Sequence, residues 1–389
     1  MKKLLLVPGL ALLLLSSCSK SKTDSSNNNN NNNNNNNAAQ VDLTQVDSYV
    51  SSFMTTYAVP GVSVAITKNG KLVYAKSYGK ADQASSTDVK NTSLFRLASV
   101  SKPITAVAIM KLVEAGSLSL SDKVFGTGSV LGTMYGTQPY GTNIANITVD
   151  ELLHHTAGGW TNDGNDPMFT NINMTQAQLI SWTLDNRPLD HVPGTNYAYS
   201  NFGFCVLGRI IEKVSGQSYE DYVKANVLAP SGITDMQISG NTLADKKPNE
   251  VTYYGQGGED PYIYNIARMD AHGGWLATAT DLARFLVHID GYTTKPDIIN
   301  SASISTMTAG SSANADYGCG WSVNAGGNWW HLGSLPGTCT EIVRSSNGFC
   351  WVVLCNTRST SANFSTDMDG LIWHAVNDNT TAWQDIDQF

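Results

Sequence analysis

The alternation of hydrophobic and polar positions predicts strands at both ends of the chain. Residues 61–68 and 71–78 alternate around Asn69-Gly70, the strongest short signal for a β-hairpin in the sequence. Near the C-terminus, strand-like runs occupy residues 318–323, 329–332, 339–344 and 349–356. Amphipathic helices are expected at residues 42–57 and 363–376. This layout predicts an α/β (α+β) fold: an antiparallel sheet of about five or more strands, flanked by N- and C-terminal helices, with an inserted, mainly helical lobe.

The first residues have the pattern of a secretory signal. A basic start is followed by an apolar run at residues 4–15, which is too short to span a membrane as a mature helix. The small residues before Cys18 resemble the cleavage box of bacterial lipoproteins. Residues 1–17 are therefore expected to be a lipoprotein signal peptide, and Cys18 is expected to carry the lipid. An ordinary signal with an incidental cysteine is the alternative, but no Ala-x-Ala site stands nearby.

Residues 18–40 are predicted to form a flexible tether. They contain an unbroken asparagine run at residues 27–37 and almost no apolar side chains, so they cannot bury enough surface to offset their ordering entropy. Residues 41–389 have the apolar fraction of a globular chain and are expected to form a single domain. Its sheet lobe is predicted at about residues 41–98 and 267–389, and its helical lobe at about residues 99–266.

Charge and cysteine content narrow the functional classes. The formal net charge is −8 and no segment concentrates basic residues, so nucleic-acid binding is not expected. An odd number of cysteines besides Cys18 leaves at least one thiol free, and none has the spacing of a zinc site. A disulfide among Cys319, Cys339 and Cys355 is left open. Cys350 and Cys355 are five residues apart in one strand-like run and face opposite ways, so they are not expected to pair. The remaining cysteine is Cys205.

The first candidate for chemistry lies at residues 95–103. Pro103 is tolerated only in the first turn of a helix, and the apolar residues that follow it have helical spacing up to a stop at Gly116. Ser99 is therefore placed at the N-terminal mouth of this helix, with Lys102 on the same face. An unprotonated lysine there would accept the hydroxyl proton and make Ser99 a nucleophile. The alternative is a helix-capping serine followed by an exposed lysine.

Two further segments carry candidate residues. Tyr199 and Asn201 form the only Tyr-x-Asn of the chain, on a Pro/Gly-marked loop before a helix predicted at residues 205–214. A nearby cationic lysine would lower the pKa of the Tyr199 phenol and suit it to general acid–base work. His331 and Gly333 lie on a predicted strand, where the glycine would let a substrate backbone approach and His331 would bind a carboxylate or the catalytic tyrosine.

Ser-x-x-Lys, Tyr-x-Asn and His-x-Gly in this order resemble the serine β-lactamase and penicillin-binding protein superfamily, in its class C β-lactamase, DD-peptidase and esterase branch. The resemblance covers about residues 46–376. Smaller stretches also follow the family order, at residues 147–158, 193–195, 229–234, 273–282 and 317–321. It implies a β-lactamase/transpeptidase-like fold for the single catalytic domain.

The resemblance also implies roles for the candidate residues. Ser99 would be the acylated nucleophile, Lys102 its proton-accepting partner and Tyr199 the proton shuttle. Asn201 would position the substrate amide, and His331 would take the place of the family's third-motif lysine. The oxyanion hole would consist of the backbone N–H groups of Ser99 and Ser334, beside Gly333. No cofactor or metal is expected, and the pair His154-His155 is interpreted as structural, with one of them at a helix end.

The expected function is that of a serine hydrolase acting on an ester or amide, such as a D-amino-acid peptide (DD-carboxypeptidase-like) or a carboxylic ester. β-Lactamase activity ranks lower because His331 removes a fixed positive charge, while Trp275, Trp329 and Trp330 are expected to add apolar surface near the cleft. The alternatives are a non-catalytic penicillin-binding-type lipoprotein and a site blocked by residues 125–146.

The expected partners are a small-molecule or peptide substrate and the membrane, which the chain would reach through the lipid on Cys18. The protein is expected to be exported and lipid-anchored to a bacterial membrane, on its periplasmic or cell-surface face. The sequence leaves the leaflet and the oligomeric state open.

Overall fold

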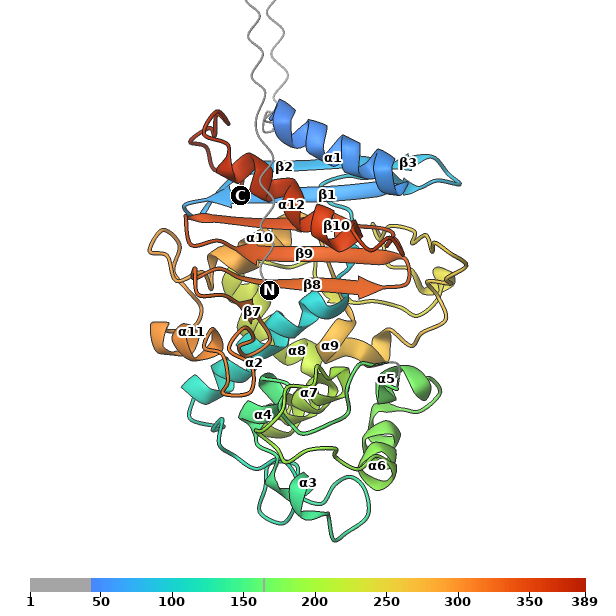
Figure 1. Cartoon of the computed structure of the whole chain (residues 1–389), viewed down its shortest axis with the longest axis vertical. Helices are drawn as coiled ribbons and strands as arrows, with labels where there is room; N and C mark the ends of the chain where they lie inside the picture. The colour runs from blue at the N-terminus through green and yellow to red at the C-terminus, as the bar shows by residue number, and fades with distance from the viewer. Residues whose placement is uncertain (1–42, 164) are drawn as a thin grey trace, which may run out of the picture. The chain divides into compact units, whose positions relative to one another are not determined.

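Within residues 43–163 and 165–389, which the computed structural model describes, an antiparallel seven-stranded sheet has the order β3-β2-β1-β10-β9-β8-β7 (Figure 1). Its strands are β1 (Gly61–Lys68), β2 (Lys71–Asp82), β3 (Thr87–Asp88), β7 (Ser322–Val323), β8 (Trp329–Leu335), β9 (Thr338–Arg344) and β10 (Phe349–Cys355). β1 pairs with β10, so the two ends of the domain meet in the middle of the sheet. The expected signal peptide, Cys18 and the tether lie outside the described residues.

The β1–β2 hairpin confirms the strongest local prediction. Asn69 and Gly70 have φ angles of 50° and 74°, and two positive φ values at the turn match the twist of the flanking strands. The prediction of a strand over residues 318–323 is wrong for its first four residues. The backbone N–H of Gly318 donates to the carbonyl of Trp321, which closes a turn, and only Ser322–Val323 pairs with β8.

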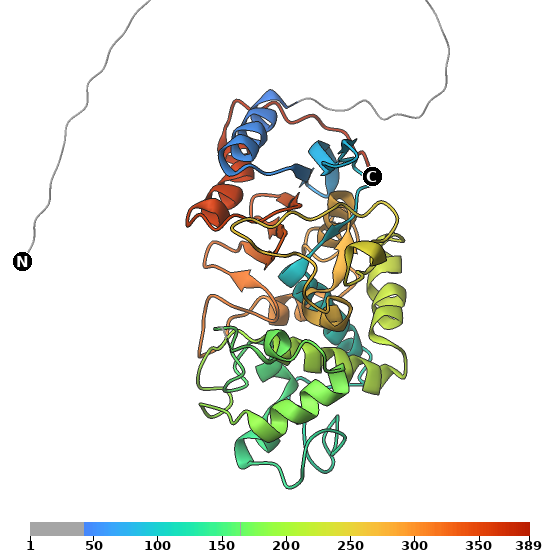
Figure 2. The same ribbon diagram turned by 90° about the vertical axis from the view of Figure 1, so that its right-hand side faces the viewer.

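The two faces of the sheet are covered by different helices. Helices α1 (Thr44–Tyr57) and α12 (Phe364–Asn377) lie together on one face, as Figure 2 shows, and α10 (Ala279–Val287) contacts β1 and β10 on the other. Strand β10 is apolar throughout because it is buried on both faces. Its alternate residues enter different cores, so Cys350 and Cys355 point to opposite faces, as predicted.

All five cysteines of the described residues are buried and free. Cys339 and Cys355 are direct partners in the β9–β10 register. Both are free in the structure, so the bridge that the sequence left open is not present there. Cys319 lies in the turn before β7, away from both of them, and contacts His154 instead.

The central helix is α2 (Ser101–Glu114), which packs against α7 (Asn201–Ser215) and α9 (Asp270–Gly273). It is buried along nearly its whole length, which explains why its sequence is apolar on all sides. A small second sheet has the order β4-β6-β5, made of Phe95–Arg96, Trp275–Ala277 and Gln237–Ile238. The other helices are α3 (Thr142–Asn146), α4 (Val149–Leu153), α5 (Pro167–Thr170), α6 (Gln176–Asn186), α8 (Tyr219–Val223) and α11 (Ser301–Met307). No helix of the described residues is long and apolar enough to cross a membrane.

Candidate active site

Ser99 is presented on a strained turn between strand β4 and helix α2. Ala98, immediately before it, has a φ of 47°, a left-handed conformation that residues with side chains rarely adopt. The turn is held on both sides: the Leu97 N–H donates to the carbonyl of Trp275, and the Thr340 hydroxyl donates to the carbonyl of Leu97. The helix starts at Ser101, two residues before Pro103, so Pro103 lies in its first turn as predicted. Ser99 therefore lies at the N-terminal mouth of the helix.

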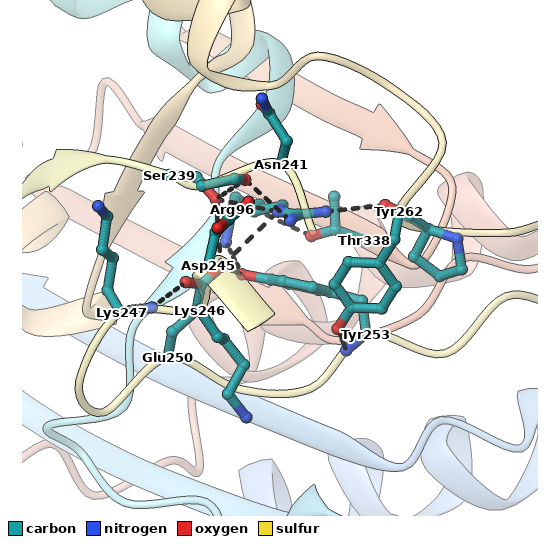
Figure 3. A network of polar contacts seen from close by, with 12 residues as sticks. Arg96, Ser239, Asn241, Asp245, Lys246, Lys247, Glu250, Tyr253, Tyr262 and Thr338 are labelled. Carbon is teal, nitrogen blue, oxygen red and sulfur yellow. Dashed lines mark hydrogen bonds and ion pairs between the residues drawn. The ribbon is translucent and has the colours of Figure 1, made fainter. Parts of the chain in front are cut away.

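A buried polar network anchors the strand that leads to Ser99 (Figure 3). The Arg96 side chain is 2% exposed and donates to Ser239 Oγ at 3.1 Å and to the carbonyls of Pro261 and Gly240. Its guanidinium also lies over the Tyr253 ring, 4.4 Å from the centroid, and 3.6 Å from a Glu250 carboxyl oxygen. Because these partners are spread over residues 239–261, they hold the Arg96 side chain, and Arg96 in turn fixes the backbone three residues before the nucleophile.

Lys102 is completely buried, and three oxygen atoms surround its amine. Its Nζ lies 2.7 Å from Asn201 Oδ1, 3.1 Å from the carbonyl of His272 and 3.0 Å from Ser99 Oγ. Burial lowers the pKa of Lys102 well below its usual value, and the charge of Asp166 opposes this only in part. The first two oxygens only accept, so they take both N–H donors of a neutral amine. The remaining lone pair therefore faces the Ser99 hydroxyl.

Asp166 fixes the orientation of Asn201, and sequence reasoning did not find it. Its carboxylate accepts from Asn201 Nδ2 at 2.8 Å, which turns the amide oxygen toward Lys102. Burial raises the pKa of Asp166 to about 6, and the hydrogen bond from Asn201 lowers it. Asp166 is therefore a carboxylate at neutral pH, able only to accept. No motif marks this residue, because it reaches Asn201 from a loop 35 residues earlier in the chain.

The expectation of a lowered pKa for Tyr199 is wrong. Burial raises the pKa of its phenol above the usual value, although the hydrogen bond with Ser99 acts in the opposite direction. The Lys102 amine lies 4.7 Å from the centre of the Tyr199 ring, but burial favours its neutral form, which supplies no charge to stabilise a phenolate. Tyr199 is therefore a neutral phenol beside the Ser99–Lys102 pair, suited to donating a proton rather than to acting as the base.

His331 takes part in a neutral hydrogen-bonded chain instead of contacting the cavity. Its Nδ1 donates to the carbonyl of Leu332 at 2.6 Å, so Nε2 accepts from the Tyr317 hydroxyl at 3.1 Å. Tyr317 in turn accepts from His155 Nε2 at 3.1 Å, and His155 Nδ1 accepts from the backbone N–H of Ser200. Burial lowers the pKa of His331 to about 3. The predicted hydrogen bond between His331 and the catalytic tyrosine is therefore not present.

This chain supports Tyr199 from behind. The His155 ring lies 4.3 Å from the Tyr199 ring and 4.9 Å from the Tyr317 ring, centroid to centroid. His155 was interpreted as structural from the sequence, and Tyr317 was seen only as part of a family-like stretch. Both hold the tyrosine of the Tyr-x-Asn motif in place, which is why they are buried and fully hydrogen-bonded.

A cavity of about 220 Å³ opens beside Ser99. Its lining includes Asn201 and Ser334, while His331 and Gly333 are not part of it. A Cβ atom on Gly333 would lie 2.2 Å from the carbonyl oxygen of Leu97 and 3.2 Å from the Ser99 nitrogen. The glycine therefore allows the nucleophile's own backbone, rather than a substrate, to approach strand β8. The paired N–H groups of Ser99 and Ser334 as an oxyanion hole stay a prediction.

The expected apolar tryptophan surface is also absent from the cavity. Trp275 is fully buried and donates to the Tyr219 hydroxyl, and Trp329 packs against Trp321. Trp330, the neighbour of Trp329 on β8, packs on the opposite face of the sheet, toward α1 and α12. Residues 125–146 contribute no side chain to the cavity lining, so the described structure does not place that segment over Ser99.

Comparison with known proteins agrees with this geometry. A model of the Beta-lactamase family matches residues 46–371. The chain is 28% identical over 313 residues to penicillin-binding protein 4* of Bacillus subtilis (strain 168), covering 72% of this chain and 64% of that protein. It is 26% identical over 318 residues to a putative D-alanyl-D-alanine carboxypeptidase of Escherichia coli (strain K12), covering 72% of each chain. The structure of an octameric penicillin-binding protein homologue from Pyrococcus abyssi superposes with a TM-score of 0.69 at 27% identity, covering 86% of this chain and 77% of that chain.

The fold is that of the β-lactamase and penicillin-binding protein class, and the chain belongs to the Beta-lactamase family. It spans less than two thirds of the length of the Bacillus subtilis relative.

Gly333→Ala tests the close packing of β8 against the nucleophile. The added methyl group would overlap the Leu97 carbonyl and displace the turn that carries Ser99. We expect the rate of Ser99 labelling by a fluorophosphonate to fall at least about 100-fold, because small misplacements of a reacting group carry costs of this size. Gly141→Ala is the control, because Gly141 has a φ of −58° and an added Cβ there meets no other atom within 4 Å. Labelling of Gly333→Ala at the wild-type rate would contradict the prediction.

Proposed function

We propose that the chain is a serine hydrolase that forms an acyl-enzyme on Ser99 and hydrolyses the amide bond of a small peptide ending in a carboxylate, as a DD-carboxypeptidase does. The observation that carries this proposal is the buried Lys102, whose lone pair faces the Ser99 hydroxyl. The family of the chain and the names of its relatives support it. A carboxylic ester in place of the amide would use the same chemistry.

The reaction follows from the position of each group. Ser99 Oγ attacks the acyl carbon while its proton passes to Lys102 Nζ. The carbonyl oxygen, now an oxyanion, faces the backbone N–H groups of Ser99 and Ser334 in the predicted hole. The Tyr199 hydroxyl gives a proton to the leaving nitrogen as the C–N bond breaks, and the proton on Lys102 replaces it. Water then attacks the Ser99 ester by the same route in reverse, releasing the acid and restoring Ser99.

Arg358 supplies a positive charge that the neutral His331 does not. It is the only Lys, Arg, Asp or Glu in the cavity lining of the described residues. Its NH1 lies 3.3 Å from Ser334 Oγ, while its Nε and NH2 bind the Glu259 carboxylate. Glu259 therefore holds the guanidinium with one edge turned toward Ser334. This edge is free to bind the carboxylate of a substrate whose scissile bond lies over Ser99.

The chain is also proposed to be exported and anchored to a bacterial membrane by lipid on Cys18. The support is the signal-like start, the small residues before Cys18 and the polar run that follows. The intact mass of the chain isolated from membranes tests this. We expect it to begin at Cys18 with a lipid modification, and Cys18→Ala to remain unmodified. An unmodified Cys18 in the membrane fraction would contradict the proposal.

Intact-protein mass spectrometry tests the acyl-enzyme. We expect a fluorophosphonate to label the full-length chain once, and Ser99→Ala and Lys102→Ala not at all or at least about 1,000-fold more slowly. Because the pKa of Lys102 is lowered, we expect labelling to fall as the pH drops through that pKa and the amine takes up a proton, at a pH well below the usual lysine value of 10.5. Labelling of Ser99→Ala, or a rate that rises toward acid pH, would contradict the mechanism.

The role of Arg358 is tested with two acyl-D-Ala-D-Ala peptides, one ending in a carboxylate and one in a carboxamide. We expect Arg358→Gln to lower kcat/KM for the carboxylate peptide about 10- to 100-fold, the value of a charge-assisted hydrogen bond. The carboxamide peptide and fluorophosphonate labelling should change little, as should both peptides with the control Arg284→Gln on α10. Equal losses on both peptides would show that Arg358 does not recognise the carboxylate. Turnover of a penicillin at a higher kcat/KM than the peptide would favour β-lactamase action instead.

A further inference from the structure

A second cluster of reactive side chains lies away from Ser99, at the end of helix α4. Asp150 is in this helix, and His154 caps its C-terminus four residues later, so their side chains lie on one face. Cys319 reaches them from the turn before β7, 165 residues further along the chain. One ligand atom from each residue lies within 4.8 Å of the other two.

The distance between Asp150 and His154 matches one edge of a tetrahedral metal site, and Cys319 lies next to them. Asp150 Oδ1 lies 3.2 Å from His154 Nδ1. Cys319 Sγ lies 3.9 Å from the same nitrogen and 3.7 Å from His154 Nε2. A zinc ion with bonds of about 2.0–2.2 Å to nitrogen and oxygen and about 2.3 Å to sulfur separates these ligand pairs by roughly 3.3 and 3.5 Å. The oxygen and nitrogen are already at this spacing. The thiol lies beside both ring nitrogens, so the Cys319 side chain must turn about its Cα–Cβ bond toward Nδ1 to reach the ion.

The second nitrogen of His154 is also placed as a metal ligand requires. His154 Nε2 lies 3.1 Å from the carbonyl of Ala309, to which its N–H donates. A hydrogen bond of this kind fixes the ring of a metal-binding histidine and leaves the other nitrogen for the ion. His154 Nδ1 also lies 3.1 Å from the backbone carbonyl of Asp150. That carbonyl accepts a second hydrogen bond, from the His154 backbone N–H at 3.0 Å. It therefore keeps a donor when Nδ1 binds a metal.

We propose that Asp150, His154 and Cys319 bind a zinc ion. One oxygen, one nitrogen and one sulfur donor favour zinc over magnesium or calcium, which select oxygen alone. Three protein ligands leave a fourth position for water. A cavity of about 520 Å³, lined by Asp150 and His154 together with Thr306 and Ala309, gives an ion access to the cluster.

The ion would join the two segments that support Tyr199. His154 directly precedes His155, and Cys319 follows Tyr317 by two residues. His155 and Tyr317 are hydrogen-bonded to each other at 3.1 Å. Both rings pack against Tyr199. The backbones of the same segments meet where the Gly320 N–H donates to the Leu153 carbonyl at 3.3 Å. The site is therefore a structural clamp behind the active-site tyrosine, and the hydrolysis itself does not use the metal.

Metal binding to the full-length, untagged chain tests the proposal. We expect metal analysis to find one zinc per chain after dialysis. We expect the absorption spectrum of the cobalt-substituted chain to show a thiolate-to-cobalt charge-transfer band and the intense visible bands of tetrahedral cobalt. Cys319→Ser should lose the thiolate band and bind zinc at least tenfold more weakly. The control Cys350→Ser, which removes another buried thiol, should keep both. Added zinc should raise the melting temperature of the wild type and of Cys350→Ser, but not of Cys319→Ser.

Asp150→Asn provides a second variant, because the Asp150 side chain is 44% exposed and its loss does not threaten the fold. It should also weaken zinc binding at least tenfold, and fluorophosphonate labelling of Ser99 reports whether each variant is folded. The proposal is overturned if the wild type shows no thiolate-to-cobalt band, or if Cys319→Ser and Asp150→Asn bind zinc as the wild type does. His154 would then be an imidazolium that links Asp150 to the Ala309 carbonyl.

Discussion

The burial of one lysine determines the chemistry of this site. A charged ammonium that is enclosed by protein loses its hydration, so the neutral amine is favoured and the pKa of Lys102 falls well below its usual value. The surrounding groups suit this neutral state. The Asn201 and His272 oxygens accept the two N–H donors, and the aromatic rings of Tyr199 and Phe204 cover the rest. Burial also raises the pKa of Tyr199. The proton transfers are therefore carried out by a neutral amine and a neutral phenol.

Such a site requires a rigid surrounding, since a neutral lysine in one orientation is useful only if Ser99 is held against it. The strained Ala98 turn is secured by Arg96 from one side and by Thr340 from β9 on the other. The tyrosine is secured by the His155–Tyr317–His331 chain, in which every donor has an acceptor. These neutral hydrogen bonds add no charge that would change the pKa of the lysine.

The positive charge beside the cavity belongs to Arg358, and strand β8 carries the neutral His331. His331 is neutral and turned into the protein, whereas Arg358 follows the last strand and reaches Ser334 with Glu259 as its counter-ion. A carboxylate that binds one edge of a guanidinium fixes the orientation of the whole group. The opposite edge then presents its N–H donors in a plane that suits a planar anion. Recognition of a carboxylate is therefore compatible with histidine at the position of the third-motif lysine.

Local patterns determined the strands and helices of this protein. Periodicity and turn residues placed the β1–β2 hairpin, the start of α2 before Pro103 and the two terminal helices, because these depend on neighbours in sequence. The motif residues Ser99, Lys102, Tyr199 and Asn201 were found for the same reason, and the structure brings them together. Tertiary structure decided the rest: the direction of His331, the burial of Trp275, the free state of the cysteines and the meeting of Asp166, Arg358 and Cys319 with their partners. No local pattern encodes these features, because each depends on side chains that the fold brings together from distant parts of the chain.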